Sequence, residues 1–532
     1  MTRRFVSRRL LARLGVVGLV VVAVVPLGAL PAHADASITG AGSTWSQIAI
    51  SQWAADVARQ GLSVNYQGVG STSGRVFYYQ DQTDFGVSEI PFTPAYRDAS
   101  GSVITDEVKL AAHRPYAYLP IVAGGTSFMY HLDINGQRFT NLHLSPDSLA
   151  KIFTRVVTNW NDPVIRADNP SVNLPSLPIR PIVRSDGSGT TAQFTAFMAN
   201  QTPSIWNAFC SRVGVNINPC PSVSLWPDIN APSQQFSDGV ADYVAAPYNN
   251  GAITYVEYAY ALQRNFPVAS MLNKAGYYTQ PTAANVAIAL QGNRLNADGT
   301  QDLRGVYTFP DKRTYPVSSY SYMIVPTTTA SPFNTDKGKT LSKFILYFVC
   351  VGQQKAAQLG YSPLPKNLVE LAFSAVNRIP GHVPTPPISQ CNNPTITGNF
   401  ILQNAPPPPP DAQKGAAPPP GATSNATLPT SAGGSGGPQS ATGPATGKAS
   451  AKNAKQNGRA TAATAPGQAD PSASGDQALI VARGPIAAPK PQDPLPLLLY
   501  VVAAAVAVLA IFAPPALKFT LDRRRAPGAS RK

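Results

Sequence analysis

Apolar and polar positions divide this chain of 532 residues into regions with different patterns. Between residues 35 and 402, short apolar segments alternate with longer segments in which apolar residues recur at helical spacing. Strands that alternate with amphipathic helices are typical of an α/β fold with parallel sheets. Two continuous apolar runs, 16–30 and 495–517, lie outside this region, and residues 403–493 are rich in Pro, Ala, Gly and Ser.

Three of the short apolar segments lead through a turn rich in Gly and hydroxyl residues into a helical pattern. These turns lie at residues 39–45, 68–75 and 184–190. Ligands of parallel sheets bind at the carboxyl ends of the strands. The first N–H groups of a helix have no intrahelical partner and attract anions, and Gly lets the backbone approach a ligand closely. Together, and without a nucleotide-binding fingerprint, these turns predict one small anion held by converging turns.

The turn at 184–190 has the side chains that an oxyanion site needs. Arg184 offers a planar fork of N–H donors that suits a tetrahedral oxyanion. Asp186, two residues further on, is placed to hold that fork in one orientation. Ser188 and Thr190 add hydroxyl donors at the start of the helical run 191–200. A plain helix N-cap is the alternative interpretation of this stretch when it is taken alone.

The net charge of +15 suggests nucleic acid, but its distribution does not. Residues 1–34 and 518–532 each carry +5, residues 403–493 carry +3, and only +2 remains for residues 35–402. A nearly neutral domain lacks the basic surface that binding to a nucleic acid requires. The basic residues therefore belong to segments for targeting and anchoring.

Both ends of the chain predict export and attachment to a membrane. Residues 1–34 combine five Arg, an apolar run and small residues at 31–34, which is the pattern of a cleaved secretory signal. Residues 403–493 predict a disordered stalk. Residues 494–517 predict one transmembrane helix, and the basic residues 518–532 predict a cytoplasmic tail. The domain at 35–402 is then expected outside the cell, tethered to its surface.

Four cysteines occur in the chain, and an even number in an exported protein favours disulfides. Of the three possible connectivities we favour Cys210–Cys220 and Cys350–Cys391, because each of these pairs closes the nearest loop. The spacing of Cys and His does not suggest zinc, and no nucleophile lies in a pattern with a base. The sequence therefore predicts a binding protein, not an enzyme, with no metal and no cofactor.

The chain resembles the PstS family, the phosphate-binding proteins of the phosphate ABC transporter, from residue 37 to about residue 375. The motifs that carry the resemblance are TGAGSTW at 39–45 (family TGAGATF), VNYQGVGS at 64–71 (VNYQGIGS), DFGVSEIP at 84–91 (DFGASDAP), RSDGSGT at 184–190 (RADGSGT) and ITYVEYAYA at 253–261 (IGYVEYAYA). The resemblance implies a type II periplasmic-binding-protein clamshell of two α/β lobes joined by a hinge. Inorganic phosphate would sit between the lobes, and permease subunits of the transporter would be the partners.

The resemblance also implies the phosphate-binding residues. They are Thr44, Trp45, Ser71 and Glu89 in the first lobe, and Arg184, Asp186, Ser188, Gly189 and Thr190 in the second. Trp45 stands where the family usually has Phe, and Glu89 where it usually has Asp. A carboxylate in the cleft can accept a hydrogen bond from the P–OH group of phosphate, whereas against sulfate it is an unpaired like charge. Glu89 is therefore expected to favour phosphate.

The expected lobe boundaries follow from the same comparison. Lobe 1 is expected at 35–121 and 319–402, and lobe 2 at 122–318, with a second crossing at 315–325. A helix at 337–350 is expected to pack on lobe 1, with Phe344, Ile345, Tyr347 and Phe348 as core candidates. Tyr255, Tyr258 and Tyr260 are expected to pack rather than to touch ligand.

Two other functions remain open at this point. One is a binder of another oxyanion, such as sulfate or molybdate. The other is a surface interaction or adhesion protein that reuses the fold, which the long stalk would suit.

Overall fold

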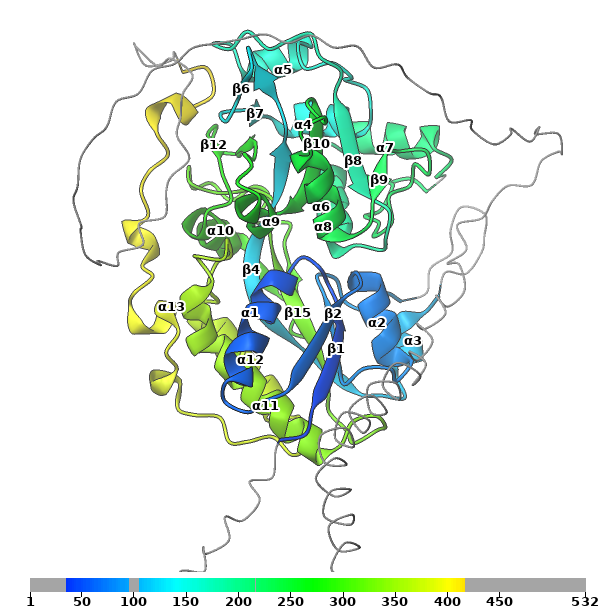
Figure 1. Ribbon diagram of the computed structural model, residues 1–532, viewed down its shortest axis with the longest axis vertical. Helices are drawn as coiled ribbons and strands as arrows, with labels where there is room; N and C mark the ends of the chain where they lie inside the picture. Colours follow the sequence, from blue (N-terminus) through cyan, green and yellow to red (C-terminus); the bar gives the residue numbers. More distant parts are fainter. Residues whose placement is uncertain (1–34, 95–104, 216, 417–532) are drawn as a thin grey trace, which may run out of the picture. The chain divides into compact units, whose positions relative to one another are not determined.

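A computed structural model of the chain describes residues 35–94, 105–215 and 217–416 (Figure 1). The predicted signal peptide at 1–34, the predicted transmembrane helix at 494–517 and the predicted tail at 518–532 lie outside the described residues, as does the stalk from residue 417 onward. Within the described ranges, no helix has the length and apolar character needed to cross a membrane.

One eight-stranded sheet runs through the fold, in the order β2-β1-β3-β15-β4-β10-β8-β9. Its strands are β1 (Ile38–Gly42), β2 (Val64–Gly68), β3 (Phe85–Ser88), β4 (Tyr116–Tyr130), β8 (Arg180–Arg184), β9 (Ser233–Gln234), β10 (Ala252–Glu257) and β15 (Ser318–Pro326). β1 is parallel to β2 and β3, and β8 is parallel to β9 and β10. The predicted α/β class is therefore confirmed.

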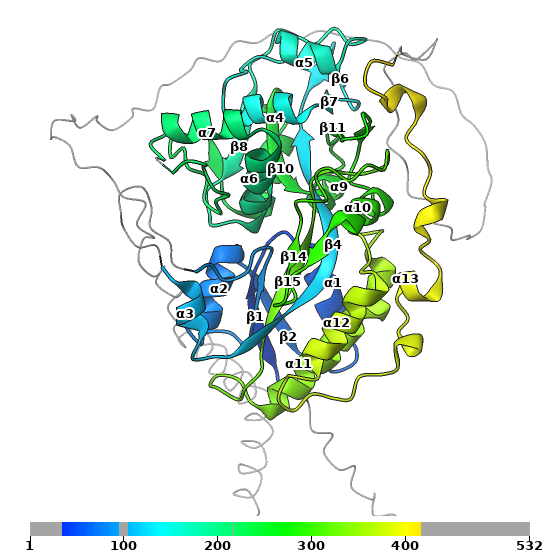
Figure 2. The same ribbon diagram turned by 180° about the vertical axis from the view of Figure 1, so that it is seen from behind.

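The long strand β4 joins two halves of this sheet. Its first part pairs antiparallel with β15, from Tyr116 to Gly125, and its last part pairs antiparallel with β10, from Thr126 to Tyr130. We call the half that contains β1, β2 and β3 lobe 1, and the half that contains β8, β9 and β10 lobe 2. Figures 1 and 2 show β4 running from one lobe to the other, and β15 lies beside its first part.

Helices cover the sheet in both lobes. In lobe 1, α2 (Ser71–Tyr79) and α3 (Glu107–Ala111) lie on one face, and α1 (Gln47–Ala58), α11 (Thr335–Val349) and α12 (Lys366–Val376) lie on the other (Figure 1). The helices of lobe 2 and its border with lobe 1 are α4 (Pro146–Phe153), α5 (Pro163–Asp168), α6 (Gly189–Gln201), α7 (Pro203–Arg212), α8 (Phe236–Ala245), α9 (Tyr258–Gln263) and α10 (Ala283–Ala289).

Smaller elements complete the described fold. The short strands are β5 (Asp133–Ile134), β6 (Gln137–Arg138), β7 (His143–Leu144), β11 (Ser270–Leu272), β12 (Tyr278–Thr279), β13 (Arg294–Leu295) and β14 (Gln301–Asp302). The last helix, α13 (Pro394–Thr397), is followed by the short 3-10 helices η4 (Leu402–Asn404) and η5 (Pro410–Ala412).

The predicted core of α11 is largely confirmed. Phe344, Ile345 and Phe348 are fully buried, and Phe348 stacks on the ring of Trp53 from α1. Tyr347 differs from the prediction, because it is only partly buried and its hydroxyl donates to Asp56 over 2.9 Å. A phenol at the edge of the core keeps its polar end hydrogen-bonded in this way.

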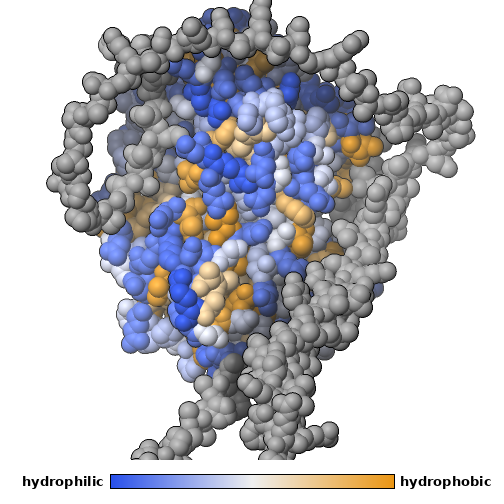
Figure 3. Space-filling view, viewed as in Figure 1, coloured by the Kyte–Doolittle hydropathy of each residue, from blue (hydrophilic) through white to orange (hydrophobic). Residues whose placement is uncertain are grey.

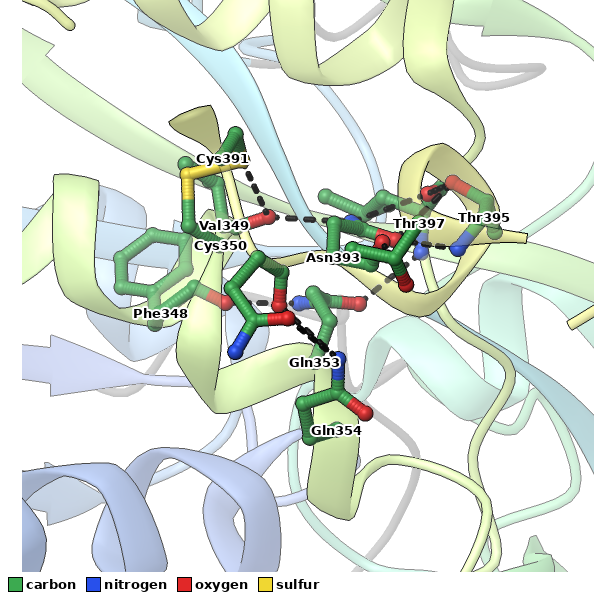
Figure 4. The surroundings of a disulfide bond; sticks show 11 residues. Phe348, Val349, Cys350, Gln353, Gln354, Cys391, Asn393, Thr395 and Thr397 are labelled. Carbon is green, nitrogen blue, oxygen red and sulfur yellow. Dashed lines mark hydrogen bonds between the residues drawn. A yellow bond between two sulfur atoms is a disulfide. The ribbon is translucent and has the colours of Figure 1, made fainter. Parts of the chain in front are cut away.

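Both predicted disulfides are present, Cys210–Cys220 and Cys350–Cys391. The second joins the end of α11 to the segment that leaves lobe 1 (Figure 4). Just beyond it, the side-chain amide of Asn393 donates to the carbonyls of Val349, over 3.0 Å, and of Leu364, over 3.2 Å. The disulfide and this amide together hold the departing chain against lobe 1.

From there the chain runs along the molecule to lobe 2, as the yellow segment in Figures 1 and 2 shows. Arg313 donates to the carbonyls of Leu402 and Ala405 over 3.2 and 3.1 Å. Gln413 forms a bridge with Tyr277, next to β12. Residues 402–414, which include the first residues of the predicted stalk, are thus held along the folded domain.

The surface on the side seen in Figure 1 is mostly hydrophilic. Figure 3 shows the apolar residues of this face in small, separate groups between hydrophilic ones. Scattered apolar side chains of this kind are ordinary on a folded domain, so this face gives no separate indication of function.

Candidate functional site

The turns that were predicted to hold an anion meet between the two lobes. The amide of Gly189 donates to Ser71 Oγ over 3.0 Å, and the side-chain amide of Gln193 donates to the carbonyl of Glu89 over 2.8 Å. Each of these bonds joins lobe 1 to lobe 2, so the lobes are closed on each other at this point. The predicted residues come to one place because they lie at or just after the carboxyl ends of β1, β2, β3 and β8.

The predicted binding residues are withdrawn from solvent. Seven of them have at most 2% of their surface exposed: Thr44, Trp45, Ser71, Glu89, Arg184, Ser188 and Thr190. Gly189 is buried as well, and Asp186 is partly buried. Trp45 is buried too, but its ring lies against Tyr361 and toward Gly124 in the crossing strand β4. Only the backbone of Trp45 therefore lies in the turn, and its N–H donates to Ser43 Oγ over 2.9 Å.

Asp186 holds Arg184 as the sequence suggested. Nε of Arg184 donates to Oδ1 of Asp186 over 2.7 Å, and Nη2 donates to Oδ2 over 2.5 Å. Oδ1 also accepts from the amide of Phe236 over 2.9 Å. A bidentate pair of this kind limits the guanidinium to one orientation. The buried positive charge of Arg184 is thereby set at the closed cleft.

Glu89 reaches across to the turn of lobe 2. Its Oε2 accepts from Ser71 over 2.6 Å, and its Oε1 accepts from Ser321 over 2.9 Å. A Cβ added to Gly189 would lie only 1.9 Å from Oε2, so the carboxyl group lies directly against that glycine. Burial raises the pKa of Glu89, and hydrogen bonds from Ser43, Ser71 and Ser321 oppose that rise.

The N-terminus of α6 supplies donors to the same place. Ser188 caps the helix, since its Oγ accepts from the amide of Thr191 over 3.2 Å. Thr190 follows in the first turn, and its Oγ1 is buried without a hydrogen-bond partner among the described residues. A buried hydroxyl without a partner costs roughly 1–3 kcal/mol. An oxyanion at the helix N-terminus would accept its hydrogen bond and meet the helix dipole.

Several residues at this contact were not predicted. Tyr255 and Tyr260 were expected only to pack, and both are buried. The hydroxyl of Tyr255 also accepts from the amide of Arg184 over 3.1 Å, and the hydroxyl of Tyr260 donates to the carbonyl of Thr44. Burial raises the pKa of Tyr255 to about 12, so its hydroxyl stays neutral. Both tyrosines therefore position the backbone of predicted site residues.

Ser237 is a further residue that the sequence did not single out. It lies in the first turn of α8, is fully buried, and its Oγ is 2.8 Å from Oγ1 of Thr44. The segment before it lacks the Gly-rich turn that marked the other anion-binding turns. Among the residues that the structure describes, no group of three or more His, Cys, Asp or Glu side chains is placed to hold a metal ion.

Comparison with known proteins found a matching family model, similar relatives and similar solved structures. Residues 28–351 match the family model described as the PBP superfamily domain. The phosphate-binding protein PstS of Xylella fastidiosa is 31% identical over 337 residues, which cover 63% of this chain and 83% of that protein. The phosphate-binding protein PstS of Haemophilus influenzae is 30% identical over 350 residues, which cover 65% of this chain and 94% of that protein. A solved periplasmic phosphate-binding protein with bound phosphate is 19% identical, with a TM-score of 0.48, over 64% of this chain and 93% of that one.

Proposed function

Because this chain belongs to the PstS family of phosphate-binding proteins, within the PBP superfamily, we propose that it captures inorganic phosphate between its two lobes and delivers it to the permease subunits of an ABC transporter. The relatives reported above are named as binding proteins, and this chain is likewise a binding protein and not an enzyme. The observation that carries the proposal is the buried, unpartnered hydroxyl of Thr190 at the N-terminus of α6, beside the turn that holds Arg184.

The nine residues named from the sequence are proposed as the phosphate site: Thr44, Trp45, Ser71, Glu89, Arg184, Asp186, Ser188, Gly189 and Thr190. Two of them act indirectly in this proposal. Asp186 orients Arg184 through its two hydrogen bonds, and Trp45 takes part only through its backbone.

Closure of the lobes is the proposed mechanism of capture. The site takes donors from both lobes, so an anion bound there stabilises the closed arrangement over an open one. The bond from Gly189 to Ser71 and the bond from Gln193 to Glu89 add to that closed arrangement. The closed surface would then be presented to the permease.

Glu89 is proposed as the element that selects phosphate. Near neutral pH phosphate retains at least one proton and can donate it to a carboxylate, whereas sulfate has none to give. The carboxyl of Glu89 lies against Gly189, at the start of α6, where an anion would bind.

The location is proposed from the sequence. A cleaved signal at 1–34 and an apolar segment at 494–517 followed by basic residues support export, with a C-terminal anchor that leaves the binding domain outside. The stalk between them would keep the domain close to its permease, which raises their effective concentration.

Calorimetric titration of the purified full-length protein with phosphate, sulfate and molybdate tests the proposal. One phosphate per chain is expected to bind, with sulfate and molybdate at least tenfold weaker. If sulfate or molybdate binds more tightly than phosphate, the chain carries another oxyanion. If none of the three binds, the interaction or adhesion function is favoured.

A further inference from the structure

Thr44, Ser237 and Arg184 form a line of hydrogen bonds across the closed cleft. Nη1 of Arg184 donates to Ser237 Oγ over 3.3 Å, and Ser237 Oγ lies 2.8 Å from Thr44 Oγ1. The amide of Ser237 also donates to Thr44 Oγ1 over 3.3 Å. Thr44 belongs to lobe 1, and the other two residues belong to lobe 2. All three side chains are at most 2% exposed, so water does not compete for these bonds.

Geometry alone allows either hydroxyl to donate in the contact between Thr44 and Ser237, and the chemistry of the three groups favours Ser237 as the donor. A guanidinium only donates, so Ser237 Oγ is an acceptor toward Arg184. Thr44 Oγ1 is already an acceptor toward the amide of Ser237. The proton of Ser237 finds its acceptor if it points at Thr44, and that arrangement leaves the proton of Thr44 available. Thr44 can then donate to an anion in the cleft.

The backbone next to Ser237 is fixed in a conformation that places the Ser237 side chain beside Thr44. Phe236, the residue before it, has φ of 61°, in the left-handed region that a bulky side chain rarely adopts. Its amide donates to Asp186, the same carboxylate that grips Arg184. On the other side of the cleft, Tyr260 donates to the carbonyl of Thr44. Both ends of the Thr44–Ser237 contact are therefore fixed by residues of the site.

We propose that Ser237 is a positioning residue of the phosphate site, which relays the hydrogen bond of Arg184 to Thr44 and so turns the Thr44 hydroxyl into a donor for the bound anion. The inference rests on the proposed function and deepens it. In such a chain each donor polarises the next one, so the terminal hydroxyl is a better donor than an isolated threonine. The relay forms only when the lobes are closed, because its two halves come from different lobes.

Phosphate titrations of the full-length protein test the relay. Ser237→Ala is expected to raise the Kd for phosphate about tenfold, mainly through faster dissociation, and Ser237→Thr, which keeps the hydroxyl, is expected to restore the affinity to within about threefold. Thr44→Val is expected to raise the Kd for phosphate as much as Ser237→Ala does. The double variant is expected to have a Kd no more than twofold above that of either single variant.

A matched control separates the relay from closure in general. Ser224 accepts from Thr72 over 3.2 Å across the same cleft, but it touches neither Thr44 nor Arg184. Ser224→Ala is expected to change the Kd less than twofold. An equal loss in Ser224→Ala and Ser237→Ala, or losses that multiply in the Thr44 and Ser237 double variant, would overturn the relay.

The wild-type titration distinguishes the two proposals. Wild-type protein that binds phosphate, with Ser237→Ala unchanged within twofold, contradicts the relay alone. Wild-type protein that binds no phosphate contradicts the proposed function and the relay together.

Discussion

The hydroxyl of Ser71 donates to Glu89 Oε2 over 2.6 Å. Ser71 Oγ also accepts from the amide of Gly189, the first residue of α6 in the other lobe, over 3.0 Å. One serine of lobe 1 therefore touches both the proposed selectivity residue and the helix that would bind the anion. Closure of the lobes and the chemistry of the site are linked through this hydroxyl.

Gly189 lies so close to Glu89 and Ser71 of the other lobe that a larger side chain would collide with them. A Cβ there would lie 1.9 Å from Glu89 Oε2 and 2.7 Å from Ser71 Oγ. Gly189→Ala is therefore expected to hold the lobes apart and to weaken phosphate binding at least tenfold, measured by calorimetry. The matched control is Gly239→Ala in α8, where the nearest atom to an added Cβ is 3.4 Å away. Equal affinity of Gly189→Ala and the wild type would show that the lobes need not approach this closely.

Arg184 is expected to supply the main charged contact to phosphate. Replacing it with Ala removes a buried charge-assisted pair and leaves Asp186 without its partner, which costs about 2–5 kcal/mol of binding free energy. Arg304→Ala is the matched control, because Arg304 makes the same kind of fork with Asp302 but is exposed. Calorimetry should give the Arg304→Ala variant the same affinity for phosphate as the wild type. Unchanged phosphate affinity in Arg184→Ala would remove Arg184 from the site.

Glu89→Gln tests selectivity. An amide keeps the size of the side chain but loses the negative charge, so the repulsion of sulfate is removed while most phosphate contacts remain. The ratio of sulfate Kd to phosphate Kd is expected to fall at least tenfold in competition titrations. Glu257→Gln, at a second fully buried glutamate, is expected to leave the ratio as it is. A ratio that stays the same in Glu89→Gln would assign selectivity to another group.

Features of this fold that neighbouring residues determine could be predicted from the sequence, whereas features that depend on contacts between distant residues could not. The strand, turn and helix around Gly189 were predictable, because Gly and hydroxyl residues mark such turns by their spacing. The place of Ser237 was not, because it depends on the two-residue strand β9 and on the unusual backbone of Phe236. The path of residues 402–414 was hidden for the same reason, since its contacts come from Arg313 and Tyr277, which are distant in sequence.

The disulfide pairs were predictable because loop length is itself a sequence property. The hydroxyl contacts of Tyr255 and Tyr260 were not, although both residues stand in a motif that carried the family resemblance. Their partners, the backbones of Arg184 and Thr44, come close only when the sheet of lobe 2 and the closed cleft have formed.

Glu257 is expected to make stability depend on pH. Burial raises the pKa of this carboxyl well above its ordinary value of 4.5. The folded protein then binds a proton that the unfolded chain releases, so stability is lost as pH rises from about 4.5 toward the raised pKa, by up to about 1.4 kcal/mol per pH unit. Thermal unfolding of Glu257→Gln should show a smaller loss of Tm between pH 5 and pH 8.

Glu370→Gln, at an exposed position of α12, is the control for that experiment. The Tm of this variant should change with pH as the Tm of the wild type does. A Glu257→Gln variant with the same pH slope as the wild type would mean that Glu257 is ionised in the folded protein despite its burial.

A crystal structure of the full-length protein grown with phosphate would show directly whether the anion binds between the lobes. We expect one phosphate between the lobes, with its oxygens accepting hydrogen bonds from the hydroxyls of Thr190 and Thr44 and from Arg184. The carboxylate of Glu89 should accept a hydrogen bond from the P–OH group of this phosphate. Phosphate bound outside the cleft, or a cleft in which Thr190 makes no contact with the anion, would contradict this expectation.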